Sequence, residues 1–80
     1  MNCYAYILKN EKGDLYIGQT NNLQERIERH NKNRITSTKK KGPWKIVWRR
    51  AFNTKGEAMK YEKYLKSLKN KKYLEKIIAG

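Results

Sequence analysis

Cysteine is almost absent from this sequence, which contains only Cys3. A lone cysteine cannot form an internal disulfide, so the class of small secreted proteins held together by disulfides is excluded. The sequence also lacks zinc-ligand spacing, a Walker loop and a serine-triad signature. We expect Cys3 to be a small buried strand residue and not a reactive thiol. This cysteine usage fits the reducing cytoplasm.

Long apolar runs are also missing. The first residues, Met-Asn-Cys-Tyr-Ala-Tyr, lack the apolar core of a signal peptide, and no later stretch is long enough to span a bilayer. The 80 residues have room for a single small domain, expected over residues 1–80. A chain of this size buries about 60–65% of its unfolded surface, so its hydrophobic margin should be thin.

Acidic residues are few. Seven Asp and Glu stand against 20 Lys and Arg, which gives a formal net charge of +13. Such a charge attracts polyanions at long range, so nucleic acid is the first partner class indicated and an anionic membrane surface a distant second. Lysine-rich surfaces also occur in proteins of thermophilic or AT-rich genomes. The charge therefore suggests a partner and not a reaction.

Hydrophobic patterns predict the order strand, strand, helix, strand, helix, helix. The strands are expected at residues 3–8, 15–18 and 44–52. A short polar turn joins the first two, so they should be antiparallel. The first two helices should begin near Asn22 and Thr54, since each has a glutamate three residues later. We expect an α/β (α+β) domain: a small three-stranded antiparallel sheet flanked by helices.

Three groups of apolar residues are expected to build the core. Alternation in the third strand puts Ile46, Trp48 and Phe52 on one face. The second helix carries a stripe at helical spacing: Ala58, Tyr61, Leu65 and Leu68. A short third helix should close the core with Tyr73, Leu74, Ile77 and Ile78.

Groups able to handle a phosphate are concentrated in residues 15–30. Tyr16 and Gly18 fall on the second strand, and Arg26 and His30 lie four residues apart on one face of the first helix. The arginine offers a planar fork that suits two phosphate oxygens. Both residues of this helix also have an ordinary interpretation. Arg26 could be a surface arginine paired with a nearby glutamate, and His30 could be structural or face the solvent.

Tyr6 should lie near Tyr16 because the turn between their strands is short. A free phenol has a pKa near 10 and is a poor base at neutral pH unless positive charge lowers that value. A tyrosine hydrogen-bonded to a water could take its proton as the water attacks phosphorus. For either residue the alternative is a half-buried strand tyrosine that packs by its ring.

Glu62 lies on or beside the buried stripe of the second helix, where a carboxylate needs a partner. A divalent ion such as Mg²⁺ or Mn²⁺ is one possible partner, and Lys66 at the i+4 position is the other. Position alone leaves both open. The loop lysines Lys39, Lys40 and Lys41, with Arg29, are the residues we expect to bind nucleic acid, although a run of lysines is also typical of a solvated loop.

As a set, these residues resemble the GIY-YIG nuclease superfamily over residues 3–78. The resemblance is carried by Tyr4-Ala5-Tyr6, Tyr16-Ile17-Gly18, Arg26, His30 and Glu62. It is greatest to small standalone bacterial members, which are similar to the N-terminal nuclease domain of the excision-repair nuclease. It implies the GIY-YIG nuclease fold and a Mg²⁺-dependent (or Mn²⁺-dependent) DNA endonuclease that acts on structured or damaged DNA, in DNA repair.

The resemblance also implies roles. Glu62 would be the metal ligand, Tyr16 the general base or the group that orients the attacking water, and Tyr6 its support. Arg26 would stabilise charge on the phosphate, His30 would position or shuttle a proton, and Gly18 would allow close approach.

The sequence departs from the family pattern in two motifs. Tyr4-Ala5 replaces Gly-Ile, and Gln19 stands where the relatives in excision repair commonly carry a lysine. If that lysine is needed, Arg26 or a loop lysine must replace it. The alternative function is a nucleic-acid-binding module on the same fold with little or no catalysis. A domain this small has few surfaces for choosing a DNA sequence, so a protein partner for targeting is expected.

Overall fold

The computed structural model describes residues 2–32, 35, 39–68 and 70–80. Three strands form one antiparallel sheet in the order β2-β1-β3. They are β1 (Cys3–Asn10), β2 (Leu15–Thr20) and β3 (Trp44–Phe52). The helices are α1 (Leu23–Asn31), α2 (Lys55–Ser67) and α3 (Lys71–Ala79). The sheet type and the element order agree with the sequence prediction.

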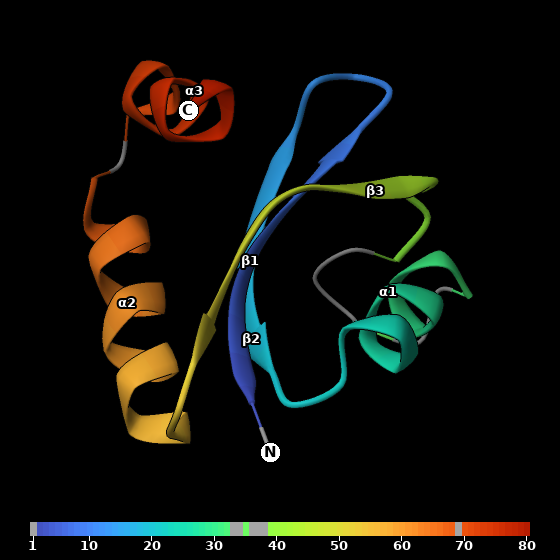
Figure 1. Cartoon of the computed structure of the whole chain (residues 1–80). Helices are drawn as coiled ribbons and strands as arrows, with labels where there is room; N and C mark the ends of the chain where they lie inside the picture. The colour runs from blue at the N-terminus through green and yellow to red at the C-terminus, as the bar shows by residue number, and fades with distance from the viewer. Residues whose placement is uncertain (1, 33–34, 36–38, 69) are drawn as a thin grey trace.

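The sheet separates two layers of helices, with α1 on one face and α2 and α3 on the other (Figure 1). β1 is the central strand, and its residues alternate between two cores. Tyr6 and Leu8 pack on the α1 side, whereas Ile7 packs against Leu65 and Leu74 on the other side. The period-2 pattern of this strand thus decides which side chains face α1.

β3 does not alternate as predicted. Ile7 pairs with Trp48 but the next residue, Leu8, pairs with Ile46, so Val47 forms a bulge. Ile46 packs on the α1 side and Trp48 on the α2 side. The predicted common face of Ile46 and Trp48 is therefore wrong, because one extra residue reverses the alternation beyond it.

Side-chain caps fix where the helices begin. Asn22 accepts a hydrogen bond from the Glu25 amide at 3.1 Å, and Thr54 accepts one from the Glu57 amide at 3.2 Å. Both caps satisfy an amide that has no partner within the helix. The two predicted helix starts are confirmed.

Asn31, the last residue of α1, ties this helix to the start of β3. Its Oδ1 accepts a hydrogen bond from the Trp44 amide at 2.7 Å, and its Nδ2 donates to the Trp44 carbonyl at 3.4 Å. Residues 36–38, the first part of the expected basic loop, lie outside the described residues. No helix in the described part of the chain is long and apolar enough to cross a membrane.

The third helix confirms one predicted core residue and corrects another. Leu74 is 8% exposed and packs with Ile7 and Leu65, but Tyr73 is 53% exposed. Leu74, Ile77 and Ile78 share the inner face at spacings of three and four, which turns the preceding residue outward. The expectation that Tyr73 closes the core is wrong.

This pair of neighbours gives a matched test of the core. We expect Leu74→Ala to lower the free energy of unfolding by about 2–4 kcal/mol, because it leaves a cavity under α3. Tyr73→Ala should lower it by less than about 1 kcal/mol, since most of that ring is already in water. Urea denaturation followed by circular dichroism measures both. Equal losses would contradict the packing described here.

Candidate active site

The site is built around the phenol of Tyr6, which lies directly over Gly18 of the neighbouring strand. The two residues are partners in the β1–β2 register, and Tyr6 is 2% exposed. A Cβ atom at Gly18 would fall 2.5 Å from Tyr6 Oη and 2.6 Å from Cζ. Only glycine leaves room for this ring, so the glycine is required here for space.

Three rings meet on the α1 side of the sheet, and we call them the ring cluster: Tyr6, Tyr16 and His30. Tyr6 Oη and His30 Nε2 share a hydrogen bond of 3.2 Å, and His30 has no exposed surface. The Tyr16 ring meets the His30 ring edge-on, with their centroids 4.8 Å apart. The Tyr6 and Tyr16 rings are tilted relative to each other, with their centroids 6.5 Å apart. β1, β2 and α1 each supply one ring.

Two charged groups act on the Tyr6 phenol. Burial raises the pKa of Tyr6 well above its usual value of 10.0, and Tyr16 raises it further. The positive charge of Arg26 lowers this pKa and the negative charge of Glu62 raises it. Tyr6 therefore stays protonated at neutral pH and acts through its hydroxyl group, while both charges lie within electrostatic reach of that hydroxyl.

His30 is neutral at physiological pH. Burial, followed by the positive charge of Arg26, lowers the pKa of His30 from 6.5 to about 4. A neutral imidazole can hold the Tyr6 hydroxyl in place through one hydrogen bond. The resemblance implies that His30 positions or shuttles a proton, and the hydrogen bond to Tyr6 is a contact through which a neutral imidazole can position that hydroxyl.

Glu62 belongs to α2, which lies on the opposite side of the sheet from α1 (Figure 1). Its Oε2 lies 3.2 Å from Lys66 Nζ, and the Glu62 side chain is 19% exposed against 56% for Lys66. The Lys66 pair, one of the two partners that the sequence left open, is therefore present. The charge of the same carboxylate raises the pKa of Tyr6.

One carboxylate suits a hard divalent ion that keeps most of its water. No group of three or more His, Cys, Asp or Glu side chains able to hold an ion occurs among the described residues. Mg²⁺ is commonly bound through one or two carboxylates together with substrate phosphates. Glu62 fits that mode of binding, in which the substrate completes the ligand set.

Sequence reasoning did not find the hollow beside this site, which we call the Arg26–Lys55 hollow. It lies where β1 begins and β2 ends, and its lining residues are Cys3, Gln19, Thr20, Asn21, Arg26 and Lys55. Cys3 lies in β1, as expected, but it is half-buried and lines this hollow, so the expectation that it is buried is wrong. Lys55 gave no signal in the sequence because it lies inside a helix-capping motif.

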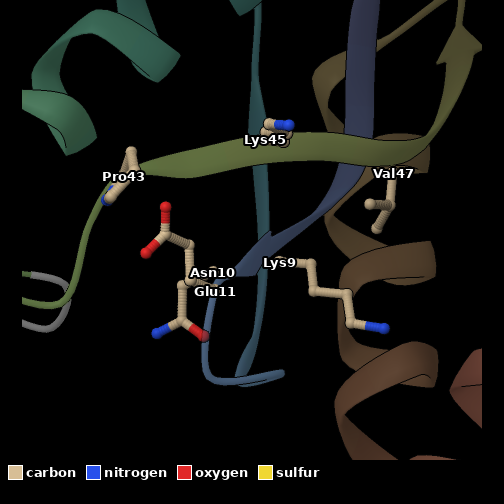
Figure 2. Close-up of a pocket in the computed structure, with 6 residues that line it drawn as sticks. All are labelled: Lys9, Asn10, Glu11, Pro43, Lys45 and Val47. Atoms are coloured by element: carbon tan, nitrogen blue, oxygen red, sulfur yellow. The ribbon is translucent and has the colours of Figure 1, made fainter.

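A second hollow lies at the other end of β1 (Figure 2). Its lining residues are Lys9, Asn10, Glu11, Pro43, Lys45 and Val47. Figure 2 shows Lys9 and Val47 extending from the sheet on the side of α2. None of the predicted catalytic residues lines this hollow.

The residues expected to bind nucleic acid lie at the surface. Arg29 Nη2 is 3.2 Å from Glu25 Oε1 in an ion pair whose side chains are both more than half exposed. Lys39, Lys40 and Lys41 are exposed in the segment that leads into β3. Exposed i,i+4 pairs of this kind contribute about 0.3–0.5 kcal/mol, so Glu25 holds the Arg29 guanidinium only weakly.

Residues 2–75 match the family model described as the GIY-YIG catalytic domain. The chain belongs to the GIY-YIG family. Its relatives include a UPF0213 protein of Clostridium perfringens, 41% identical over 92% of this chain and 81% of that protein. A UPF0213 protein of Bacillus licheniformis is 41% identical over 90% and 78% of the two chains.

A solved relative shares the fold of this GIY-YIG chain. The solution NMR structure of a UPF0213 protein from Bacillus halodurans superposes with a TM-score of 0.58 at 36% identity. The match covers 94% of this chain and 81% of that one. The resemblance inferred from the tyrosine and glycine motifs is confirmed at the level of family and fold.

Gly18 can be tested against a second glycine. We expect Gly18→Ala to displace the Tyr6 phenol, break its hydrogen bond to His30 and lower the free energy of unfolding by about 1–3 kcal/mol. Gly56→Ala is the control, because its Cβ would meet nothing closer than Thr54 Oγ1 at 4.0 Å and alanine favours helix. Thermal denaturation of both variants measures the difference. A stable Gly18→Ala variant with an unchanged Tyr6 environment would refute the close approach.

The buried histidine predicts how stability depends on pH. Between pH 6.5 and about 4 the unfolded chain binds a proton at His30 that the folded chain does not, so acid favours unfolding. The lowered pKa predicts a loss of roughly 3 kcal/mol across that window. Urea denaturation measures the free energy of unfolding at pH 7 and at pH 5. The parent should lose more than half of this amount between the two pH values, and His30→Gln should lose little. A parent curve that is flat from pH 7 to pH 5 would show that His30 is protonated in the fold.

Proposed function

We propose that this protein is a divalent-metal-dependent DNA endonuclease that hydrolyses phosphodiester bonds. The observation that carries the proposal is the convergence at one phenol: the Tyr6 hydroxyl bonds to His30 and responds to the charges of Arg26 and Glu62. Phenols, with a guanidinium and a carboxylate in electrostatic reach of one of them, form a set suited to a phosphoryl group. Membership of the GIY-YIG family supports the reaction class.

Arg26 is the group that binds and stabilises the reacting phosphate. Its planar guanidinium can donate two hydrogen bonds to phosphate oxygens. It is half-buried, and its charge reaches both Tyr6 and His30. A fixed positive charge in partly dry surroundings stabilises negative charge that builds up on the phosphate in the transition state.

Tyr16 is the residue we assign to the attacking water. Its ring is held edge-on between His30, at 4.8 Å, and Trp44, at 6.5 Å. Tyr16 would take a proton from the water or orient it as it attacks phosphorus. Tyr6 keeps its own proton, so its role is to fix His30 and the adjacent ring.

Glu62 is the residue we assign to the metal ion. Its carboxylate would hold Mg²⁺ or Mn²⁺, and such an ion supplies positive charge that stabilises negative charge on a phosphate. Lys66 holds the carboxylate at 3.2 Å in its absence. The ion pair therefore holds the Glu62 side chain in one orientation at a partly buried position.

The proposed substrate is structured or damaged DNA. A net charge of +13 supplies affinity for any phosphate backbone. Contacts to phosphates position a protein on DNA but carry no sequence information. A chain of 80 residues has little surface left for reading bases, so we propose that DNA shape, or a partner protein, directs the cut.

Nicking of supercoiled plasmid DNA in Mg²⁺ or Mn²⁺ tests the function. We expect the parent to convert supercoiled to relaxed plasmid and Glu62→Gln to be slower by about 100-fold or more, because it removes the metal-binding charge. The control is Glu75→Gln, an equal charge change at an exposed position of α3, which should cut at the parent rate.

The same assay decides between the enzyme and the alternative function. DNA binding by the parent and by Glu62→Gln, with no cutting by either, would support a non-catalytic binding module and overturn the proposal. Because charge supplies the affinity, DNA binding itself should weaken steeply between about 50 and 200 mM salt.

A further inference from the structure

We propose that the Arg26–Lys55 hollow is a second phosphate site, which binds a backbone phosphate next to the one that is cut. The proposal rests on the nuclease function proposed above and identifies where the DNA strand continues beyond the reacting group. Lys55, the first residue of α2, becomes a substrate-positioning residue.

The lining of the hollow suits an anion. Two of its side chains are cationic, Arg26 and Lys55, and none of the described residues that line it is acidic. Gln19 and Asn21 add amide groups, and Thr20 a hydroxyl group. Amides and hydroxyls are the neutral groups that commonly bond phosphate oxygens.

Both cations are available to a ligand. Within residues 2–32 and 39–68, ion pairs join Arg29 to Glu25 and Lys66 to Glu62, and neither Arg26 nor Lys55 takes part in either. Two like charges that line one hollow repel each other, and a bound phosphate removes that repulsion. The fold has brought them together from α1 and α2, which lie on opposite faces of the sheet (Figure 1).

Arg26 connects the hollow with the ring cluster. The same guanidinium lines the hollow and lowers the pKa of His30. A strand whose reacting phosphate lies at Arg26 would therefore pass its neighbouring phosphate into the hollow. Gln19 of the same lining is neutral, although relatives in excision repair commonly carry a lysine at that position. In this chain Lys55 supplies a positive charge to the hollow instead.

The hollow in Figure 2 is a useful contrast. It also has two lysines, Lys9 and Lys45, but the carboxylate of Glu11 lies in the same lining. The Asn10 amide there already donates to Asp14 and to the Lys41 carbonyl. An anion is therefore less favoured in that hollow than between Arg26 and Lys55.

Binding measured without catalysis tests the site. In a Glu62→Gln background without metal, anisotropy of a labelled DNA duplex gives affinity at several salt concentrations. We expect Lys55→Gln to weaken binding several-fold and to reduce the slope of log affinity against log salt by about one unit, the loss of one phosphate contact. Lys63→Gln, an exposed lysine of the same helix, is the matched control. Equal effects of the two substitutions would overturn the proposal.

Cys3 provides a readout inside the hollow, because it is the one cysteine of the sequence. Saturating DNA should slow alkylation of its thiol by iodoacetamide several-fold, in the parent and in Lys63→Gln. Each rate is compared with and without DNA in the same variant. An unchanged rate under saturating DNA would overturn the site, as would protection by inorganic phosphate but not by DNA.

These outcomes separate the two proposals. If DNA protects Cys3 and Lys55→Gln alone lowers the salt slope, but the parent does not nick plasmid, the phosphate site holds and the nuclease function fails. If the parent nicks plasmid and Cys3 is not protected, the nuclease function holds and the site is refuted.

Discussion

The arrangement of the site depends on one steric fact: the Tyr6 phenol occupies the space where Gly18 has no side chain. Because the ring takes up this space, its hydroxyl lies where it shares a hydrogen bond with His30 of α1. The hydrogen bond in turn fixes the imidazole against which Tyr16 packs. A missing methyl group on β2 thus determines the position of three rings.

Burial sets the chemistry of these rings. Removing Tyr6 and His30 from water keeps the phenol protonated and the imidazole neutral, so neither carries a charge at physiological pH. The charges that do act at the site, Arg26 and Glu62, come from half-buried positions on the two helix layers. Tyr6 and His30 therefore stay uncharged, and the charges of Arg26 and Glu62 act on the Tyr6 phenol with opposite sign.

Local patterns predicted most of the fold from sequence. Alternation in β1, the caps at Asn22 and Thr54 and the stripe of α2 are each encoded by a few neighbouring residues, and all agree with the structure. The bulge at Val47 could not be predicted from the sequence, because the apolar pattern of β3 continues through it. Only the pairing of β3 with β1 shows that the register shifts there. Tyr73 was misplaced for a related reason, since an aromatic residue at a helix start does not by itself show which face it occupies.

The site residues were likewise predicted where local motifs mark them and missed where their role depends on tertiary structure. Motif spacing in the sequence pointed to Tyr6, Tyr16, Arg26, His30 and Glu62, and the structure brings three of their rings into contact and two of their charges within reach of Tyr6. The depth of burial of His30 was missed, because a lone histidine on a short helix is usually nearer to water. Lys55 was missed because its meaning depends on a hollow made by two strands and two helices far apart in sequence.

The position of α2 on the far side of the sheet has a consequence for how the molecule is made. During synthesis the phenols, Arg26 and His30 emerge first, and a chain that ends at β3 carries a strong positive charge without the carboxylate from residue 62. Such an unfinished chain would carry charge that attracts a polyanion but would lack the carboxylate that we assign to the metal ion. The proposed cutting ability would therefore appear only when the last helices dock, which spares nearby nucleic acid from a half-made enzyme.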